Sequence, residues 1–436
     1  MKINTYIANF LDCDRIEELR FVHSCFYYSL YKEETYMHCF RKVTEDLYWV
    51  GGSDRRIELF ENIFPLSDGV SYNSYLLLDE KTVLFDSADY AIGRQFLENI
   101  QAVLGGRDLD YLIVNHMEPD HCAMIDELAL RYPDMKIIGN IKTFPMIDQF
   151  FDFDLEGKKI IVKEGDTFCT GRHTLHFVMA PMVHWPEAMM TYDEASKILF
   201  SADAFGTFKA LNGSIFNDEI DFDRDWLNEA RRYYTNIVGK YGMQVQSVLK
   251  KASGLDIRMI CPLHGPIWRT DLDYIIEKYD KWSRYEPEVK GVMIAYASMY
   301  GNTENMADIL AVKLAEKGVK DIRMHNISKT HVSELIADSF KYSHIVLAAP
   351  TYNNGIYPLM DNYLEDMQAL ALKNRTIAVL GNGSWAPQST KLISTRISGM
   401  KDMSLMVANV TIKSSVKNAQ LEELESLSRQ IAEEVL

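Results

Sequence analysis

Short apolar runs separated by polar turns dominate the chain between residues 46 and 285. Residues 71–88 hold two such runs around Asp79-Glu80-Lys81, a pattern that predicts a β-hairpin. Further strands are predicted at 46–52, 111–115, 158–166, 173–181 and 197–205, and helices at 98–106, 123–133, 221–253 and 272–282. Successive strands with helices laid outside them predict an αββα sandwich for roughly residues 40–285.

The pattern changes after the polar segment 283–291, which contains Pro287 and is the predicted domain boundary. Beyond it, apolar and amphipathic stretches alternate regularly, with strands predicted at 292–297, 321–327, 344–350, 376–381 and 405–410. Five strands separated by helices predict a doubly wound, five-stranded parallel sheet, an α/β unit whose ligands bind at the carboxyl ends of the strands. We therefore expect three parts: an extension at 1–36, one domain at 37–286 and another at 291–436.

The net charge, the apolar runs and the cysteine content of the chain exclude several classes of protein. The net charge of −16 over 436 residues argues against a nucleic-acid-binding surface, and the absence of an apolar run of membrane-spanning length predicts no membrane span. Six scattered cysteines without a CxxC pair predict neither a disulfide framework nor an iron–sulfur centre. The aromatic segment 1–36 lacks the features of a signal peptide, and we hypothesise that Met37 is an alternative start.

The first strand of the second domain is followed by a loop rich in hydrogen-bond donors. Its sequence, SMYGNT, opens a predicted helix and comprises Ser298, Met299, Tyr300, Gly301, Asn302 and Thr303. Hydroxyl and amide donors at a helix N-terminus can hold a phosphate, and the lack of a following lysine argues against a triphosphate. An ordinary capped turn is the alternative for this loop taken alone.

Two more loops leave the third and fourth strands at the same edge of the sheet. They supply Pro350, Thr351, Tyr352 and Asn353 from one, and Asn382, Gly383, Ser384 and Trp385 from the other. Tyr352 and Trp385 can sandwich a flat ring while the neighbouring polar groups meet its heteroatoms. With these three loops, residues 291–436 resemble a flavodoxin-like domain, and the resemblance implies that they bind flavin mononucleotide (FMN).

In the first domain, seven residues, NHMEPDH, hold two histidines and two acids directly after a predicted buried strand. These are His116, Glu118, Asp120 and His121, and three similar residues, His184, Asp203 and His264, also end apolar runs downstream. A charged group carried there by a strand is costly to bury unless it is paired or binds a metal. Four histidines and three carboxylates suit two metal ions that share a bridging acid.

The pattern resembles the metallo-β-lactamase superfamily, whose hydrolases carry HxHxDH and bind zinc. Glu118 replaces the second histidine, and an anionic oxygen donor favours oxidised iron over hydrolytic zinc. This metal-binding pattern is followed by a flavodoxin-like domain. The combination makes residues 40–436 similar to the flavodiiron proteins, also called A-type flavoproteins. The resemblance implies that one iron is held by His116, Glu118 and His184, the other by Asp120, His121 and His264, and that Asp203 bridges them.

The resemblance carries further implications for function. In some flavodiiron proteins the residue matching His121 swings away from the metal, and Trp185, beside a ligand, either walls the gas pocket or simply packs. The expected activity is reduction of O2 to water, of NO to N2O, or both, with FMN relaying electrons from a separate donor such as rubredoxin. The family implies a cytoplasmic, head-to-tail homodimer or homotetramer. The alternatives are a zinc hydrolase with an attached flavodoxin module and a pure electron carrier.

Overall fold

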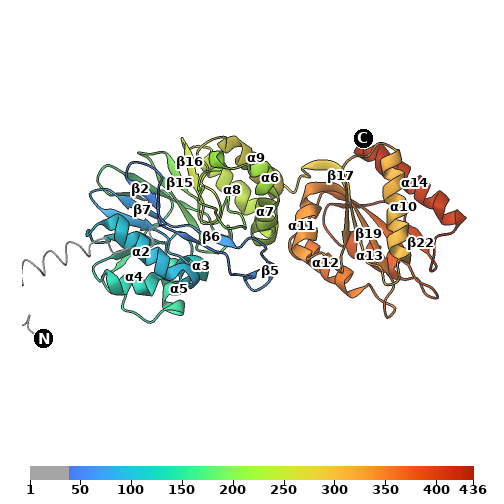
Figure 1. Ribbon diagram of the computed structural model, residues 1–436, viewed down its shortest axis with the longest axis horizontal. Helices are drawn as coiled ribbons and strands as arrows, with labels where there is room; N and C mark the ends of the chain where they lie inside the picture. The colour runs from blue at the N-terminus through green and yellow to red at the C-terminus, as the bar shows by residue number, and fades with distance from the viewer. Residues whose placement is uncertain (1–38) are drawn as a thin grey trace, which may run out of the picture.

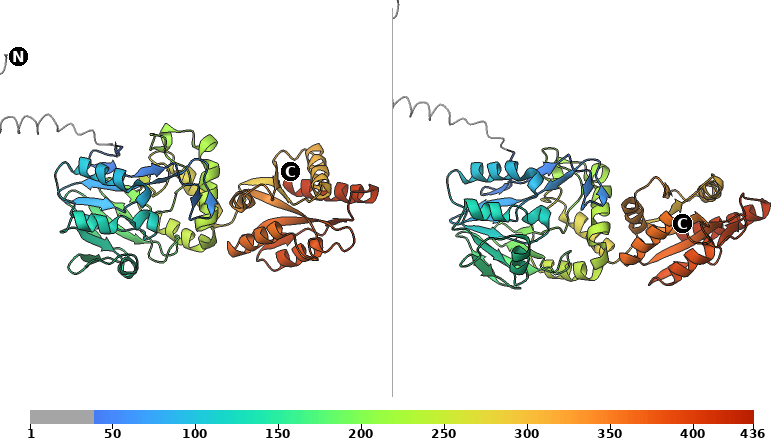
Figure 2. Two further views of the ribbon diagram at one scale, coloured as in Figure 1. Left: turned by 60° about the horizontal axis from the view of Figure 1, so that its bottom comes forward. Right: turned by 90° about the horizontal axis from the view of Figure 1, so that it is seen from below.

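The computed structural model describes residues 39–436, so the extension at 1–36 and the hypothesis about Met37 lie outside the described residues. Two lobes lie side by side along the long axis of the molecule (Figure 1). They stay separate in the two further views as well, with the C-terminal lobe at one end (Figure 2).

A seven-stranded sheet forms one layer of the N-terminal lobe. Its strands, in spatial order, are β1 (Arg41–Lys42), β2 (Leu47–Trp49), β7 (Tyr75–Leu78), β8 (Thr82–Phe85), β9 (Tyr111–Ile113), β10 (Lys136–Gly139) and β11 (Lys159–Ile161). The predicted hairpin is confirmed: β7 and β8 are antiparallel, with Tyr75 opposite Phe85. From β8 onward the strands are parallel, and helices connect each strand to the next from β8 to β11.

A five-stranded sheet forms the second layer and packs face to face on the first. Its strands are β12 (Thr167–Cys169), β13 (Thr174–Met179), β14 (Met189–Asp193), β15 (Ile198–Phe200) and β16 (Met259–Cys261). The buried apolar side chains between the sheets come from both, and the rings of Phe85 and Phe200 stack at 3.7 Å. This shared core holds the two layers together.

Helices cover the outer face of each sheet and complete the predicted αββα sandwich. The seven-stranded sheet is covered by α2 (Gly93–Leu104), α3 (Pro119–Cys122), α4 (Ile125–Arg131) and α5 (Thr143–Phe150) (Figure 1). The other is covered by α7 (Leu227–Tyr233), α8 (Gly242–Ala252) and α9 (Leu272–Ser283), with the short α6 (Phe222–Asp225) beside them.

Two predicted elements of this lobe differ in detail. The helix predicted at 221–253 is broken by a π-turn and a 3-10 turn between α7 and α8. A side chain at Gly242 would come within 2.3 Å of the Ser283 carbonyl oxygen, so the chain turns here to let α8 approach the end of α9. The strand predicted at 46–52 is also divided, because Gly52 already belongs to β3 (Gly52–Asp54), which pairs with β6 (Val70–Tyr72).

The C-terminal lobe is a doubly wound parallel sheet, as predicted. Its order is β18 (Ile322–Asn326), β17 (Val289–Tyr296), β19 (Tyr342–Pro350), β20 (Arg375–Asn382), then β21 (Met403–Leu405) and β22 (Val410–Ile412), which both pair with β20. One face is covered by α11 (Val332–Lys341), α12 (Pro358–Ala369) and α13 (Ser389–Ser398). The other face is covered by α10 (Asn302–Glu316) and α14 (Asn418–Val435).

The fifth strand predicted at 405–410 is wrong as a continuous element. It is replaced by β21 and β22, with an interruption in which Val407 is 97% exposed. The side chain of Asn409 accepts the backbone N–H of Val379 at 2.9 Å, in place of a strand partner. The apolar sequence of this segment therefore predicts one strand. In the structure the strand is interrupted, because the Asn409 side chain takes the hydrogen bond that a strand backbone would make.

Buried charged groups tie the lobes together at a linker of residues 284–288. Glu288 accepts hydrogen bonds from Arg231, at 3.0 Å, and from the Trp282 indole, at 2.7 Å, both in the N-terminal lobe. Arg375, at the start of β20, donates to the carbonyl oxygens of Tyr285 and Phe340, each at 2.6 Å. Since these groups are buried and hydrogen-bonded, the linker is fixed to both lobes. No helix in the described part of the chain is long and apolar enough to cross a membrane.

Candidate metal centre and ligand pocket

The ends of strands from both sheets of the N-terminal lobe carry the seven predicted metal-binding side chains to one place. His116 and Glu118 follow β9, and Asp120 and His121 lie in the short helix α3. The others lie in loops: His184 between β13 and β14, Asp203 after β15 and His264 after β16. All seven are at most 8% exposed.

These residues form two groups. Within each group, the possible ligand atoms all lie within 4.8 Å of one another. His116, Glu118, His184 and Asp203 make the first, and Asp120, His121 and His264 make the second.

Asp203 joins the groups. Its Oδ2 lies 3.1 Å from Nε2 of His116, and its Oδ1 lies 3.3 Å from Nε2 of His121. One carboxylate therefore faces both groups, which is the geometry required of a bridging ligand.

Unpaired carboxylate oxygens show that these residues fit a pair of cations. Neither oxygen of Asp120 or Asp203 has a hydrogen-bond partner among the described residues, although both side chains are buried. The Nε2 atoms of the histidines crowd together: those of His116 and His184 lie 3.3 and 3.0 Å from the same oxygen of Glu118, and those of His121 and His264 are 3.0 Å apart. Burial raises the pKa of Asp120 to about 8, with the Glu118 and Asp203 charges adding to the effect. Bound dications would supply the missing positive charge.

Side chains behind the centre orient its histidines. Glu187, which is 1% exposed, accepts hydrogen bonds from Nδ1 of His116 and the Met117 backbone N–H, each at 2.9 Å. Nδ1 of His264 donates to the Ser71 carbonyl oxygen at 2.7 Å. These bonds leave Nε2 of each imidazole free for a metal. Nδ1 of His121 has no such partner among residues 39–436, so His121 is held less firmly.

Glu187 and Glu61 are functional candidates that the sequence did not reveal. Glu61 lies in the tight hairpin of β4 (Leu59–Phe60) and β5 (Phe64–Pro65), whose Phe60 ring lies 5.6 Å from the His264 ring. The residue is exposed, but desolvation of its carboxyl and the neighbouring Glu118 charge raise its pKa to about 8. Their signals in the sequence were weak, because Glu61 is a single acid in a turn and Glu187 is a single acid beside a proline.

Trp185 lies against two of the candidate metal-binding histidines. Its ring is 5.5 Å from that of His116 and 6.4 Å from that of His184, in edge-to-face arrangements. The residue is half-buried, so its indole packs against these two candidate ligands while part of it stays accessible to solvent. This position is compatible with both predicted roles, as a wall of a gas pocket and as simple packing.

The second site is a pocket of about 410 Å³ at the carboxyl ends of β17, β19 and β20. Twelve of the fourteen predicted residues line it: Ser298, Met299, Tyr300, Asn302, Thr303, Pro350, Thr351, Asn353, Asn382, Gly383, Ser384 and Trp385. Gly301 and Tyr352 are not among the lining residues. Gly301 instead has φ of 89° at the turn into α10, with no neighbour within 4 Å of an added side chain, and Tyr352 packs against Tyr357.

The pocket fits a flat ring bearing a phosphate. The start of α10 presents unpaired backbone N–H groups, and Trp385 and Tyr300 are 88% and 91% exposed with their faces unused. Sequence analysis missed Asn354, Ala386 and Ser414, which also line it. Ser414 follows β22, and its backbone N–H donates to Asn382 at 3.0 Å, so it reaches the pocket only through sheet pairing.

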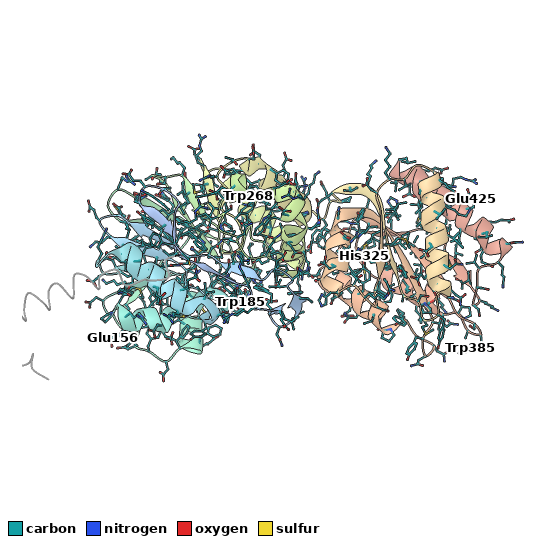
Figure 3. All side chains as sticks on the ribbon, in the orientation of Figure 1. Glu156, Trp185, Trp268, His325, Trp385 and Glu425 are labelled. Carbon is teal, nitrogen blue, oxygen red and sulfur yellow. The ribbon has the colours of Figure 1, made fainter. Side chains whose placement is uncertain are left out.

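The two sites lie in different lobes and are separated within one chain. Figure 3 labels Trp185, beside the metal-binding residues, and Trp385, at the far margin of the C-terminal lobe. The lobes are tied by Glu288 and Arg375, so the pocket cannot turn toward the metal-binding residues of the same chain without breaking buried hydrogen bonds.

Comparison with known proteins covers both lobes. Residues 70–265 match the family described as "ODP family beta lactamase", and residues 294–424 match the flavodoxin family. An uncharacterised protein of Methanocaldococcus jannaschii is 34% identical, over 81% of this chain and 88% of the relative. The anaerobic nitric oxide reductase flavorubredoxin of Escherichia coli O1:K1 is 32% identical, over 81% of this chain and 74% of the relative.

Solved structures agree with these matches. The rubredoxin oxygen:oxidoreductase from the anaerobe Desulfovibrio gigas superposes with a TM-score of 0.85 at 28% identity, covering 91% of this chain and 98% of that one. The flavodiiron protein of Giardia intestinalis gives a TM-score of 0.85 at 26% identity, covering 91% and 96%. The similarity therefore extends over both lobes and their arrangement.

Proposed function

This chain belongs to the flavodiiron protein family, and on that premise we propose that it reduces O2 to water, NO to N2O, or both, at two irons in its N-terminal lobe. The observation that carries the proposal is the convergence of seven buried side chains with unpaired carboxylates between four histidines. The oxygen donor Glu118 in place of a third imidazole favours iron over zinc.

We assign the ligands from the two groups of side chains. His116, Glu118 and His184 hold one iron, Asp120, His121 and His264 hold the other, and Asp203 bridges them. When bound, two ferrous ions and a reduced flavin would supply the four electrons needed to convert O2 and four protons to two waters, or the two needed to convert two NO and two protons to N2O and water. The three carboxylates offset the positive charge of the irons in the low-dielectric interior.

The residues around the centre position ligands and control access. Glu187 holds the His116 ring so that Nε2 faces the centre, and Ser71 does the same for His264. The hairpin that carries Phe60 and Glu61 covers the mouth of the centre, where it limits entry of water. In the C-terminal lobe, the start of α10 binds the FMN phosphate and Trp385 covers the flavin ring.

Electrons would pass from FMN to iron between two copies of this chain, in a head-to-tail homodimer or a tetramer of such dimers. Support comes from the separation of Trp185 and Trp385 and from the fixed linker at Glu288 (Figure 3). Residues 37–286 act as the di-iron unit and 291–436 as the flavin unit. The electron donor is a rubredoxin or a similar protein, and the enzyme works in the cytoplasm.

The experiment that tests this function measures loss of O2, and separately of NO, at an electrode with reduced rubredoxin in excess. The full chain is loaded with iron and FMN beforehand. Consumption of either gas, with water or N2O as product, supports the proposal. Asp203→Asn, which removes the bridging charge, should lose most activity, while Asp193→Asn changes a carboxylate of similar burial outside the centre and should keep it.

A hydrolase would be supported instead if neither gas disappears and if the protein, as purified from iron-rich medium before loading, contains zinc and no iron. Equal activity of the Asp203→Asn and Asp193→Asn variants would remove Asp203 from the metal centre.

A further inference from the structure

A cavity of about 440 Å³ lies between the lobes, away from both sites described above. The N-terminal lobe contributes Lys240 and Tyr241, which lie in the 3-10 turn before α8, and Met243 and Gln244 at the start of α8; the linker contributes Tyr285. The C-terminal lobe contributes Lys373 and Lys401, which precede β20 and β21. Because the strands of this sheet are parallel, the cleft lies at the sheet edge opposite the flavin loops.

The charge of this interlobe cleft is opposite to that of the molecule as a whole. Three lysines line it and no aspartate or glutamate does, although the net charge of the chain is −16. Among residues 39–436 no carboxylate pairs with Lys240, Lys373 or Lys401; the Lys373 ammonium instead lies 4.8 Å from the centre of the Tyr285 ring. Unpaired like charges around one cavity repel, so an anion bound there would stabilise the fold.

The remaining walls combine the amides of Gln244 and Gln368 with apolar and aromatic side chains, a lining that complements a flat ring with polar edges. Met243 is 79% exposed at the mouth, and Met400 is buried at the base. The Tyr285 hydroxyl donates to the Gly239 carbonyl oxygen at 2.8 Å, which fixes this wall in place. A cavity of this volume is within the usual range for small-molecule sites, and methionine and tyrosine faces suit planar ligands.

We propose that the interlobe cleft binds a nucleotide, with its phosphates on Lys240, Lys373 and Lys401 and its base against Tyr241 and Met243. The phosphates satisfy the three ammonium groups, and the ring covers the exposed methionine. Since the cleft has one wall from each lobe, a bound nucleotide stabilises their present arrangement. The site is thereby coupled to the relative placement of the metal-binding and flavin lobes, without contact with either cofactor.

Binding is tested by calorimetry at low ionic strength, with adenosine diphosphate as the probe and FMN-loaded, iron-loaded full-length protein. Adenosine and inorganic phosphate serve as partial ligands. We expect the diphosphate to bind more tightly than either partial ligand, because only it uses both the lysines and the apolar walls. Inorganic phosphate binding equally well would overturn a nucleotide site, and so would the absence of saturable binding of the diphosphate.

Two triple variants are compared. The test variant carries Lys240→Gln, Lys373→Gln and Lys401→Gln. The control variant carries Lys136→Gln, Lys250→Gln and Lys320→Gln, so both variants lose three positive charges. The second set lies on exposed surface outside the cleft. We expect binding to weaken by about tenfold or more only in the first set. Equal weakening in both sets would show a non-specific charge effect and refute the site. If the first set folds poorly, the double variant of the exposed Lys240 and Lys401 makes the same comparison.

Discussion

Replacing Glu187 with glutamine should weaken iron binding without changing any proposed ligand. The Glu187 carboxylate accepts hydrogen bonds from Nδ1 of His116 and the Met117 backbone N–H, each at 2.9 Å. Burial raises the pKa of Glu187, but the His116 interaction outweighs it and holds the pKa below its ordinary value, so the group is charged. The Glu187→Gln amide keeps the shape of the side chain but loses the charge, and its NH2 group can face His116.

The size of the effect follows from the type of bond lost. Hydrogen bonds to a charged group contribute about 1.5–3 kcal/mol. Loss of an outer partner of a metal-bound histidine typically costs about 10–100-fold in metal affinity, equivalent to about 1.4–2.7 kcal/mol. The free energy of the hydrogen bond and the free energy equivalent to the loss of metal affinity are similar in size. This agreement is expected if the Glu187–His116 hydrogen bond acts mainly by orienting the His116 ring. We therefore expect iron affinity to fall by about 10–100-fold.

The assay is competition for ferrous iron between the protein and a colorimetric chelator, under anaerobic conditions. Asp193→Asn is the matched control, because Asp193 is 3% exposed and accepts a hydrogen bond from Nδ1 of His173 at 2.7 Å, outside the metal centre. This control should lose stability but keep its iron affinity. Equal iron affinity in wild type and Glu187→Gln would refute the argument that Glu187 orients a ligand.

Three further predictions concern other parts of the molecule. Glu118→His restores the zinc-hydrolase pattern HxHxDH, so zinc should replace iron as the main metal found by elemental analysis; unchanged iron preference would contradict the role given to this oxygen donor. Burial lowers the pKa of His173, but hydrogen bonds to Asp193 and Asp46 outweigh it and raise the pKa from 6.5 to about 8. The stabilisation is thus complete below about pH 6.5 and is lost as pH rises through about 8, by up to about 2 kcal/mol in urea unfolding, and His173→Gln should flatten this dependence. Trp385→Ala should lower FMN affinity by about tenfold in a flavin-fluorescence titration while leaving the melting temperature unchanged, since this side chain is 88% exposed; a normal affinity would show that the indole does not cover the ring.

The seven candidate metal-binding residues could be picked out from the sequence because their signal is local. Each follows an apolar run, and a charged residue at the end of a buried strand is unusual enough to attract attention. The structure brings all seven together, with Asp203 facing both groups. Sequence alone could not reveal Glu187 or Glu61, because their positions depend on how a loop and a hairpin fold back over His116 and Glu118.

The loops around the predicted FMN pocket show the same limit of prediction from sequence. Loops that directly follow strands were found, since parallel strands end at one edge of the sheet. Ser414 was missed because it reaches the pocket through the pairing of β22 with β20, which no local pattern encodes. The predicted boundary segment 283–291 contains the linker 284–288, which lies between the end of α9 at Ser283 and the start of β17 at Val289.

The interruption between β21 and β22 has a consequence for solubility. These strands pair only with β20 and so form an outer edge of the sheet, where an unbroken strand could recruit a strand from another molecule. Each piece has only three residues, and Asn409 already occupies the Val379 N–H between them, so the edge offers no continuous row of free backbone groups. The same break that defeats strand prediction therefore protects the folded protein against edge-to-edge aggregation, even with Val407 exposed in the gap.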